Sequence, residues 1–157
     1  MARSTPATIL LTARGAAFDL HSYAYEPGAD RIGLQAAEAL GAPPRCVLKT
    51  LVVKIDGRPA CVLLASDREA SLKKVAAAFG GKAAAMAPPA EAERLTGYKV
   101  GGISPFGQRR ALPTAIDAAA LAEALVFVNG GQRGLQLRLS PADLVRVAEA
   151  MVADLAA

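Results

Sequence analysis

The sequence has little of the chemistry that metal centres, disulfide frameworks and histidine-based catalysts need. Its 157 residues include one histidine, His21, two cysteines, Cys46 and Cys61, and no tryptophan. There is neither a CxxC motif nor a second cysteine pair, and a single histidine cannot complete a common zinc site. The glycine motifs that bind nucleotide phosphates are missing as well. We therefore expect no metal and no cofactor, and we interpret both cysteines as small core residues.

Long apolar runs are also absent. No stretch approaches the ~18 to 20 apolar residues of a membrane span, and the apolar run near the N-terminus is too short for a secretory signal. We expect no membrane contact and a cytoplasmic location. Hydrophobic residues make up 53% of the chain and charged residues 20%, which excludes an intrinsically disordered protein. The length predicts a single domain over residues 1–157.

Turn and capping signals predict an α/β or α+β domain built around one curved, mixed sheet. Asp56-Gly57 separates two apolar runs, 47–55 and 60–65, which is typical of a β-hairpin. Ser140 can cap a final helix, which we expect to extend to about residue 153. The remaining expectations are helices over 6–14, 31–40, 71–79 and 90–95, and strands over 18–25, 114–117, 125–129 and 135–139.

Lys49 is the most informative single residue. Side chains alternate across a strand, so Lys49 shares one face of run 47–55 with four branched aliphatic residues, Val47, Leu51, Val53 and Ile55. A lysine on such a face either extends to solvent from the start of the strand or meets an anion or a ligand. The second interpretation places Lys49 at a pocket, aimed at a carbonyl oxygen or a phosphate.

The glycine-rich segment 100–107 is the second candidate site. Adjacent glycines allow the backbone N–H groups of Gly101, Gly102 and Ile103 to converge on a developing oxyanion. Pro105 would stiffen this segment, and the alternative is an ordinary tight turn. Ser104 does not fit a nucleophile elbow, because Phe106 stands where that motif needs glycine.

The charge balance is mildly basic. The net charge is +4 and the isoelectric point is about 9.3. Several basic residues accompany the glycine-rich turns, which is what contact with a phosphate backbone would need. The alternative is ordinary solvated surface charge. These candidate contact residues are Lys99, Arg109, Arg110, Arg133 and Arg138.

Several segments of the chain form a specific combined pattern. These segments are His21-Ser22-Tyr23, Val47-Leu48-Lys49-Thr50-Leu51, residues 72–76, 96–107 and 112–114, and Gly130-Gly131-Gln132-Arg133-Gly134-Leu135. Taken together, they resemble the YbaK/EbsC family of aminoacyl-tRNA deacylases, relatives of the editing domain of bacterial prolyl-tRNA synthetases. The resemblance spans nearly the whole chain. It implies a compact, mixed and partly barrelled β-sheet surrounded by helices, and a deacylase enzyme.

The resemblance also implies site roles. Lys49 would be the key active-site residue, and the loop from Gly101 to Pro105 would face the scissile ester. The remaining implied substrate-binding residues are Tyr23, Ser104 and Gly131. The chain departs from the family at two positions. Gln136 stands where related sequences often carry an aspartate, and Ile32 stands where they carry an aromatic residue. Both differences bear on substrate range.

The implied substrate is cysteine wrongly esterified to tRNA(Pro), and Cys-tRNA(Cys) is a further candidate. The sequence offers no nucleophile with a base and an orienting partner. Attack by the substrate's own thiol on its ester carbonyl would account for that absence. Prolyl-tRNA synthetase is the expected partner. Two alternatives stay open: a deacylase for alanine or another small amino acid on tRNA(Pro), and a non-catalytic module that binds aminoacyl-tRNA or a synthetase.

Overall fold

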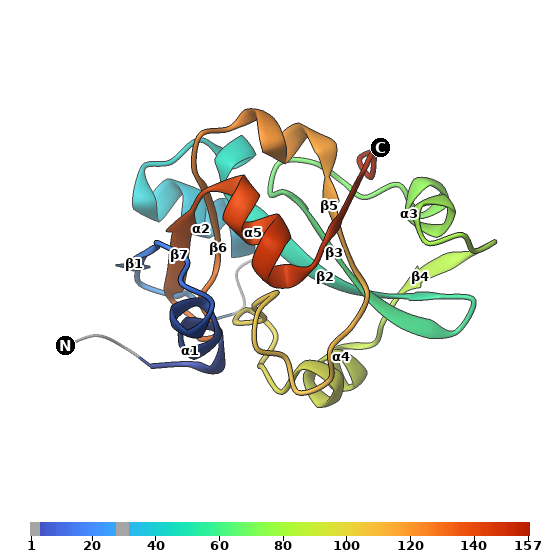
Figure 1. The fold of residues 1–157 in the computed structure, drawn as a ribbon, viewed down its shortest axis with the longest axis horizontal. Helices are drawn as coiled ribbons and strands as arrows, with labels where there is room; N and C mark the ends of the chain where they lie inside the picture. The colour runs from blue at the N-terminus through green and yellow to red at the C-terminus, as the bar shows by residue number, and fades with distance from the viewer. Residues whose placement is uncertain (1–3, 28–31) are drawn as a thin grey trace.

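The computed structural model describes residues 4–27 and 32–157, except for the side chain of Ile32 (Figure 1). None of the helices in these ranges has the length and apolarity that crossing a membrane requires. The α-helices are α1 (Pro6–Ala13), α2 (Ile32–Leu40), α3 (Leu72–Ala78), α4 (Pro89–Thr96) and α5 (Pro141–Ala148). The strands are β1 (Asp19–Ser22), β2 (Leu48–Ile55), β3 (Arg58–Ala65), β4 (Ala84–Met86), β5 (Thr114–Asp117), β6 (Val126–Asn129), β7 (Leu135–Leu139) and β8 (Met151–Ala153). Two short 3-10 helices, η1 (Pro44–Cys46) and η2 (Ala118–Ala122), complete the described elements.

The strands form two sheets rather than the single curved sheet we expected. One has three antiparallel strands in the order β1-β7-β6, and the other has five in the order β4-β2-β3-β5-β8. An isolated parallel bridge between Val47 and Phe127 brings β2 beside β6. The sheets are not closed into a barrel. The mixed α/β fold class is confirmed, whereas the partly barrelled arrangement is not, because the two sheets meet without forming a continuous ladder.

The β2–β3 hairpin confirms the turn prediction. Asp56 and Gly57 have φ angles of 49° and 84°, the left-handed values that a tight two-residue hairpin turn requires. Ile55 pairs with Arg58 beside the turn, and the register continues until Lys49 lies opposite Leu64. The hairpin therefore fixes Lys49 near the end of β2 that lies against the three-stranded sheet.

The prediction for the C-terminal helix is wrong in its length. Helix α5 ends at Ala148, because Glu149 adopts the left-handed conformation with φ 51°. The next residues form β8, which pairs in parallel with β5. Apolar residues at helical spacing suggested a longer helix. The competing interaction is a strand pairing with residues more than thirty positions away, which local periodicity does not reveal.

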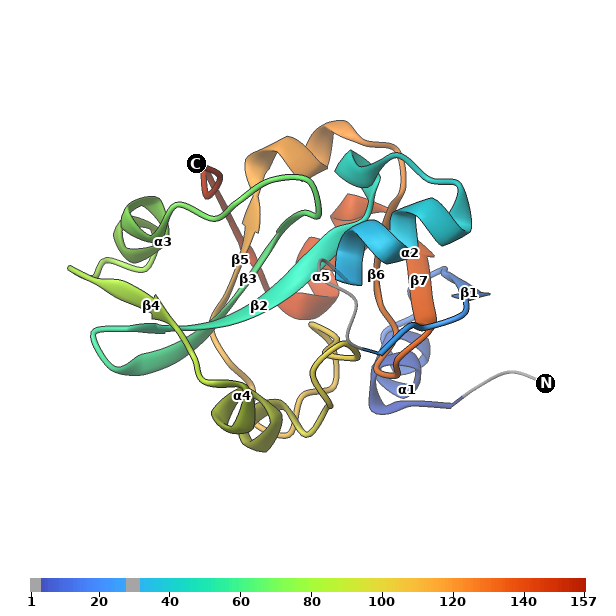
Figure 2. The same ribbon diagram turned by 180° about the vertical axis from the view of Figure 1, so that it is seen from behind.

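Helices α2 and α5 cover opposite faces of the three-stranded sheet, as a comparison of Figures 1 and 2 shows. The inner face packs Val128 and Leu137 against α5, with Phe106 completely buried in the same cluster. The outer face packs Phe127 against α2. At the end of this outer face, β6 lies beside β2.

Candidate functional site

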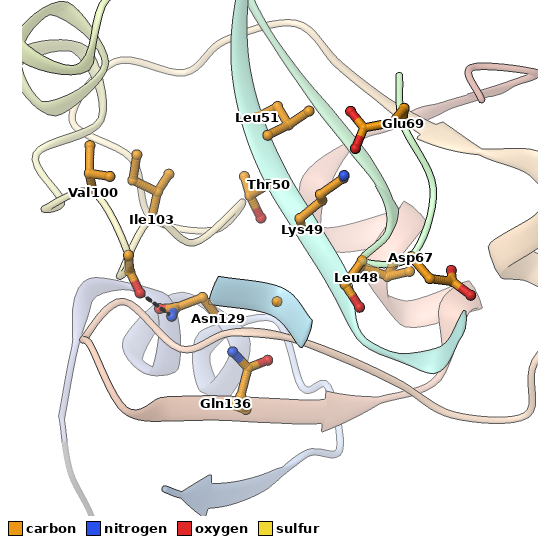
Figure 3. A pocket seen from close by; sticks show the side chains of 13 residues that line it. Leu48, Lys49, Thr50, Leu51, Asp67, Glu69, Val100, Ile103, Asn129 and Gln136 are labelled. Atoms are coloured by element: carbon orange, nitrogen blue, oxygen red, sulfur yellow. Dashed lines mark hydrogen bonds between the residues drawn. The ribbon is translucent and has the colours of Figure 1, made fainter. Parts of the chain in front are cut away.

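A cavity of about 370 Å³ occupies the space between the two sheets (Figure 3). This volume lies in the usual range for small-molecule sites. Strand β2 contributes residues from Leu48 to Leu51, and β6 and β7 contribute Asn129 and Gln136. The start of α2 at Gly33 and two loops complete the wall, the glycine-rich segment near Gly101 and the turn after β3. The site is therefore assembled from regions that are distant in the sequence.

Lys49 lines this cavity, as its position on β2 suggested. On the same face, Val53 is completely buried and Ile55 is nearly so. The opposite face is equally covered, since Leu48 and Val52 are only 3% and 4% exposed. Lys49 is half-buried, and its ammonium group forms no hydrogen bond or ion pair with any other described residue. A half-buried cation without a partner is available to a ligand.

The glycine-rich loop faces Lys49 across the cavity through Val100, Gly101 and Ile103. Gly101 has a φ of 92°, and a Cβ there would lie 2.8 Å from the Tyr25 hydroxyl. Among the described residues, the N–H groups of Gly101 and Ile103 have no acceptor. Two N–H groups without acceptors on a loop that lines the cavity are suitable donors for an oxyanion.

Gly102 does not take the donor role we expected. Its N–H already donates to the carbonyl of Lys99 at 2.7 Å, so it closes a turn instead of facing a ligand. A Cβ on Gly102 would lie 2.8 Å from the backbone nitrogen of Arg133. Glycine at this position therefore permits the close contact between the two glycine-rich turns.

Asn129 is a site residue that the sequence analysis missed. Its Nδ2 donates to the Gly101 carbonyl at 3.1 Å, as Figure 3 shows. Its Oδ1 accepts the N–H groups of Gly131 at 2.7 Å and Gln132 at 3.2 Å. Asn129 thus joins the two glycine-rich turns. The sequence signal was an asparagine directly before Gly130-Gly131, since asparagine side chains commonly cap such turns.

Gln136 also lines the cavity and is only 4% exposed. It lies between His21 and Asn129 in the strand register, so the three side chains share one face of the sheet. Its Oε1 is buried without a hydrogen-bond partner among the described residues, and so is the Thr50 hydroxyl, which also lines the cavity. Buried polar groups normally have partners. These two atoms are therefore candidates for contact with a ligand.

Tyr23 is not among the residues that line the cavity. It packs half-buried against the cluster that contains Val47 and Phe127. Burial raises the pKa of Tyr23, and the neighbouring Gln136 amide opposes that shift. Tyr23 is therefore a neighbour of Gln136 and does not belong to the cavity lining itself.

Three further predicted substrate residues are brought close to the site without lining the cavity. Ser104 is completely buried, and its Oγ accepts the N–H of Phe106 at 3.3 Å. Pro105 is buried beside it. Gly131 has a φ of 95° and packs against Tyr98 and Thr5. The position of all three indicates that they shape the loops.

Ile32 begins α2, but its side chain falls outside the described residues. The following residue, Gly33, lines the cavity. A Cβ on Gly33 would lie 2.6 Å from the Cβ of Ser66, so the start of α2 sits close against the loop after β3. The expected influence of position 32 on substrate range stays a prediction.

The loop after β3 contributes two carboxylates that the sequence analysis missed, Asp67 and Glu69. Both residues are exposed at the cavity rim. No periodic pattern indicates where a loop side chain points, so the sequence carried no signal for them. Within residues 4–27 and 32–157, no three His, Cys, Asp or Glu side chains cluster as metal ligands would.

The basic residues divide into two groups. Lys99, Arg109 and Arg110 are exposed, and Arg133 donates from Nε to the Val100 carbonyl at 2.9 Å. The Arg133 guanidinium also lies over the Tyr25 ring, 5.4 Å from its centre. Arg138, by contrast, forms an ion pair with Asp19 on β1. Arg133 is therefore the predicted basic residue most directly attached to the cavity wall.

Replacing Gly102 by alanine is expected to lower the rate of the ester cleavage that the sequence resemblance implies by about 100-fold, because a shift of about 1 Å in a positioning group can have that effect. The added Cβ meets the Arg133 backbone, so the loop that carries Gly101 and Ile103 must move. Steady-state kinetics on a mischarged tRNA would measure the loss. Gly81→Ala is the matched control, since its Cβ would lie 2.2 Å from Ile55 Cγ2, outside the cavity. Equal losses in both variants would contradict the prediction.

Comparison with known proteins agrees with this geometry. Residues 26–147 match the model of the aminoacyl-tRNA editing domain. The chain is 32% identical over 120 residues to EbsC of Enterococcus faecalis, provisionally named a Cys-tRNA(Pro)/Cys-tRNA(Cys) deacylase, with 76% of this chain and 73% of EbsC covered. It is 33% identical over 107 residues to ProXp-y of Escherichia coli, named a multifunctional Ser/Thr-tRNA deacylase, with 64% of each chain covered.

A solved structure adds to these relatives. The crystal structure of a provisionally named trans-editing enzyme for prolyl-tRNA synthetase superposes with a TM-score of 0.83 and 28% identity, covering 99% of both chains. The chain belongs to the aminoacyl-tRNA editing domain family. The expectations of this family and of an aminoacyl-tRNA deacylase are confirmed.

Proposed function

We propose that the protein removes cysteine wrongly esterified to tRNA(Pro), with Cys-tRNA(Cys) as a second substrate to be tested. The observation that supports the proposal is a cavity lined both by Lys49, whose ammonium group has no partner among the described residues, and by Gly101 and Ile103, whose N–H groups have no acceptor there. The likeness to EbsC supports cysteine as the amino acid. Cysteine and proline are close in size, and a pocket separates near-isosteres by only about 1 to 3 kcal/mol, so a second, thiol-selective site has a clear purpose.

The mechanism we propose uses the substrate's own thiol. Its sulfur attacks the ester carbonyl and forms a carbon–sulfur bond. The carbon–oxygen bond to the ribose then breaks, the thiol proton passes to the departing ribose oxygen, and a cyclic thiolactone is released. The N–H groups of Gly101 and Ile103 would stabilise the oxyanion, a contribution of about 3 kcal/mol for one well-placed donor. Lys49 would hold the carbonyl or the terminal adenosine in place.

The tRNA would approach from the side of the glycine-rich turns. Lys99, Arg109 and Arg110 are exposed there for contact with the phosphate backbone, and Arg133 adjoins the cavity loop. Selection of tRNA(Pro) would come from prolyl-tRNA synthetase, because the described residues form no separate module for reading a tRNA. We place the reaction in the cytoplasm, where tRNA is charged.

A second candidate substrate is another small amino acid on tRNA(Pro), such as alanine. The observation that favours it is Gln136, which puts a neutral amide into the cavity where related sequences often carry an aspartate. The likeness to ProXp-y also extends the candidate side chains beyond cysteine.

The experiment that decides between these amino acids measures ester loss from tRNA(Pro) charged separately with cysteine, alanine and serine. We expect the cysteinyl ester to disappear fastest, because it alone carries the thiol that the proposed mechanism uses. Rapid loss of the alanyl ester with persistence of the cysteinyl ester would overturn the assignment to cysteine.

A further inference from the structure

Glu69 holds an unpaired carboxylate at the rim of the cavity. The residue follows β3 in the loop that closes one side of the site. Its side chain forms no hydrogen bond or ion pair with any other described residue, Lys49 included. Figure 3 shows the carboxylate on the side of the cavity that carries the end of the Lys49 side chain. The carboxylate is therefore free to accept a cationic ligand group.

The loop that carries Glu69 is held in place by the C-terminal segment. The N–H of Ala157 donates to the Glu69 carbonyl at 2.8 Å, and the N–H of Ser71 donates to the Leu155 carbonyl at 2.8 Å. An isolated antiparallel bridge pairs Ala70 with Ala156. Backbone contacts on both sides of Glu69 thus fix the point from which its side chain reaches the cavity.

Gln136 gives independent evidence that a polar ligand belongs in this cavity. It is 4% exposed, lines the same space, and its Oε1 has no partner among the described residues. Figure 3 shows its amide directed into the space between the sheets. The amide carries no charge, so Gln136 cannot neutralise a cation, and Glu69 and Asp67 are the carboxylates that line the cavity.

An aminoacyl ester brings a cation to this site. Its α-ammonium group lies one bond from the carbon that bears the scissile carbonyl. If Lys49 contacts that carbonyl, two positive charges come close together, and like charges at short range oppose binding. A carboxylate beside the α-ammonium group offsets this repulsion and also fixes the orientation of the ester.

We propose that Glu69 binds the α-ammonium group of the aminoacyl ester, an inference that rests on the proposed function. Glu69 supplies the anionic contact that Gln136 does not. The resulting recognition depends on the α-amino group and not on the amino-acid side chain, so it applies to every aminoacyl ester that enters the cavity.

The test removes the charge from the enzyme and from the substrate separately. Glu69→Gln and the unmodified protein are compared on cysteinyl-tRNA(Pro) and on its α-hydroxy analogue, which keeps the thiol but lacks the ammonium group. We expect the substitution to lower kcat/KM for the cysteinyl ester by about tenfold, mainly through KM, as loss of a charge-assisted hydrogen bond does. The α-hydroxy ester should lose less than about twofold, because it has no ammonium group for Glu69 to bind.

Glu38→Gln is the matched control, since Glu38 is an exposed carboxylate on α2 outside the cavity. This variant changes the net charge equally and should leave both rates unchanged. Equal losses on the two esters in Glu69→Gln would overturn the proposal, because they would show that the effect of Glu69 does not depend on the α-ammonium group. Unchanged rates on both esters would overturn it as well.

The proposed function is judged separately by the rate of the unmodified protein on the cysteinyl ester. If that ester persists, the same variants are compared on the alanyl ester and on the lactyl ester. These two differ by the same replacement of an ammonium by a hydroxyl group. Selective loss on the alanyl ester would support Glu69 even though the assignment to cysteine had failed.

Discussion

Replacing Lys49 by alanine is expected to lower deacylation of cysteinyl-tRNA(Pro) by at least about 100-fold, the size of effect seen when one donor to a developing oxyanion is removed. The Lys49 ammonium lines the cavity and has no partner among the other described residues. Its removal therefore leaves no buried counter-charge behind. We expect the free energy of unfolding to change by less than about 1 kcal/mol. Single-turnover kinetics and a thermal melt would measure the two quantities.

Lys54→Ala is the matched control for this variant. Lys54 lies on the same strand but on its other face, where its Nζ is 3.2 Å from Glu91 Oε1. Its loss should leave the rate unchanged and lower stability slightly, as expected for a partly exposed ion pair. The variant Lys49→Arg tests whether a positive charge at this position is sufficient or the shape of the ammonium group also matters, since arginine keeps the charge on a wider, planar group. A rate for Lys49→Ala equal to that of the unmodified protein would refute the assigned role.

The part of the site that could be predicted rests on local signals. Asp56-Gly57 encodes a turn with two left-handed residues, and alternation along β2 then places Lys49 on one face of a strand. Adjacent glycines at 101 and 102 marked a loop of close contacts. Each of these features depends on residues near one another in the sequence, so elementary conformational rules were sufficient to find them.

The rest depends on long-range register. Asn129 and Gln136 become neighbours only because β6 pairs with β7. Glu69 reaches the cavity because C-terminal residues hold its loop. Strand β8 forms because β5 accepts a parallel partner beyond Glu149. No single-sequence periodicity encodes such pairings, so the contacts that bring these residues to the cavity are visible only in the folded chain.

Proximity in the sequence also misled the assignment of substrate residues. Ser104 follows Ile103 directly, yet Ile103 lines the cavity while Ser104 is completely buried. Gly102 lies between two residues whose N–H groups have no acceptor, but its own N–H donates to the Lys99 carbonyl. In an irregular loop, successive residues point in unrelated directions. A resemblance can therefore locate the loop without identifying the atoms that face the ligand.

The thiol of the substrate is expected to be indispensable. With 2-aminobutyryl-tRNA(Pro), which has a methyl group in place of the thiol, we expect deacylation at least about a thousandfold slower than with the cysteinyl ester, because intramolecular attack gains most from correct placement. Neither cysteine of the protein lines the cavity, so neither offers a substitute thiol. Cys61 is completely buried outside it, and desolvation raises the pKa of its thiol to about 12. Cys46 lies outside the cavity as well and donates to Glu123.

Release of the thiolactone, detected by mass spectrometry during cysteinyl ester cleavage, would accompany the rate difference. Seryl-tRNA(Pro) serves as the control, because a hydroxyl group fills similar space but is a far weaker nucleophile than a thiol. If the 2-aminobutyryl and cysteinyl esters are cleaved at equal rates, water is the nucleophile and the cavity must activate it. Thr50 and Gln136, whose side-chain oxygens are buried without partners among the described residues, would then be the groups positioned to hold that water. Attack by the substrate thiol and attack by water therefore give different products. Detection of the free thiolactone distinguishes the two mechanisms without a comparison of rates.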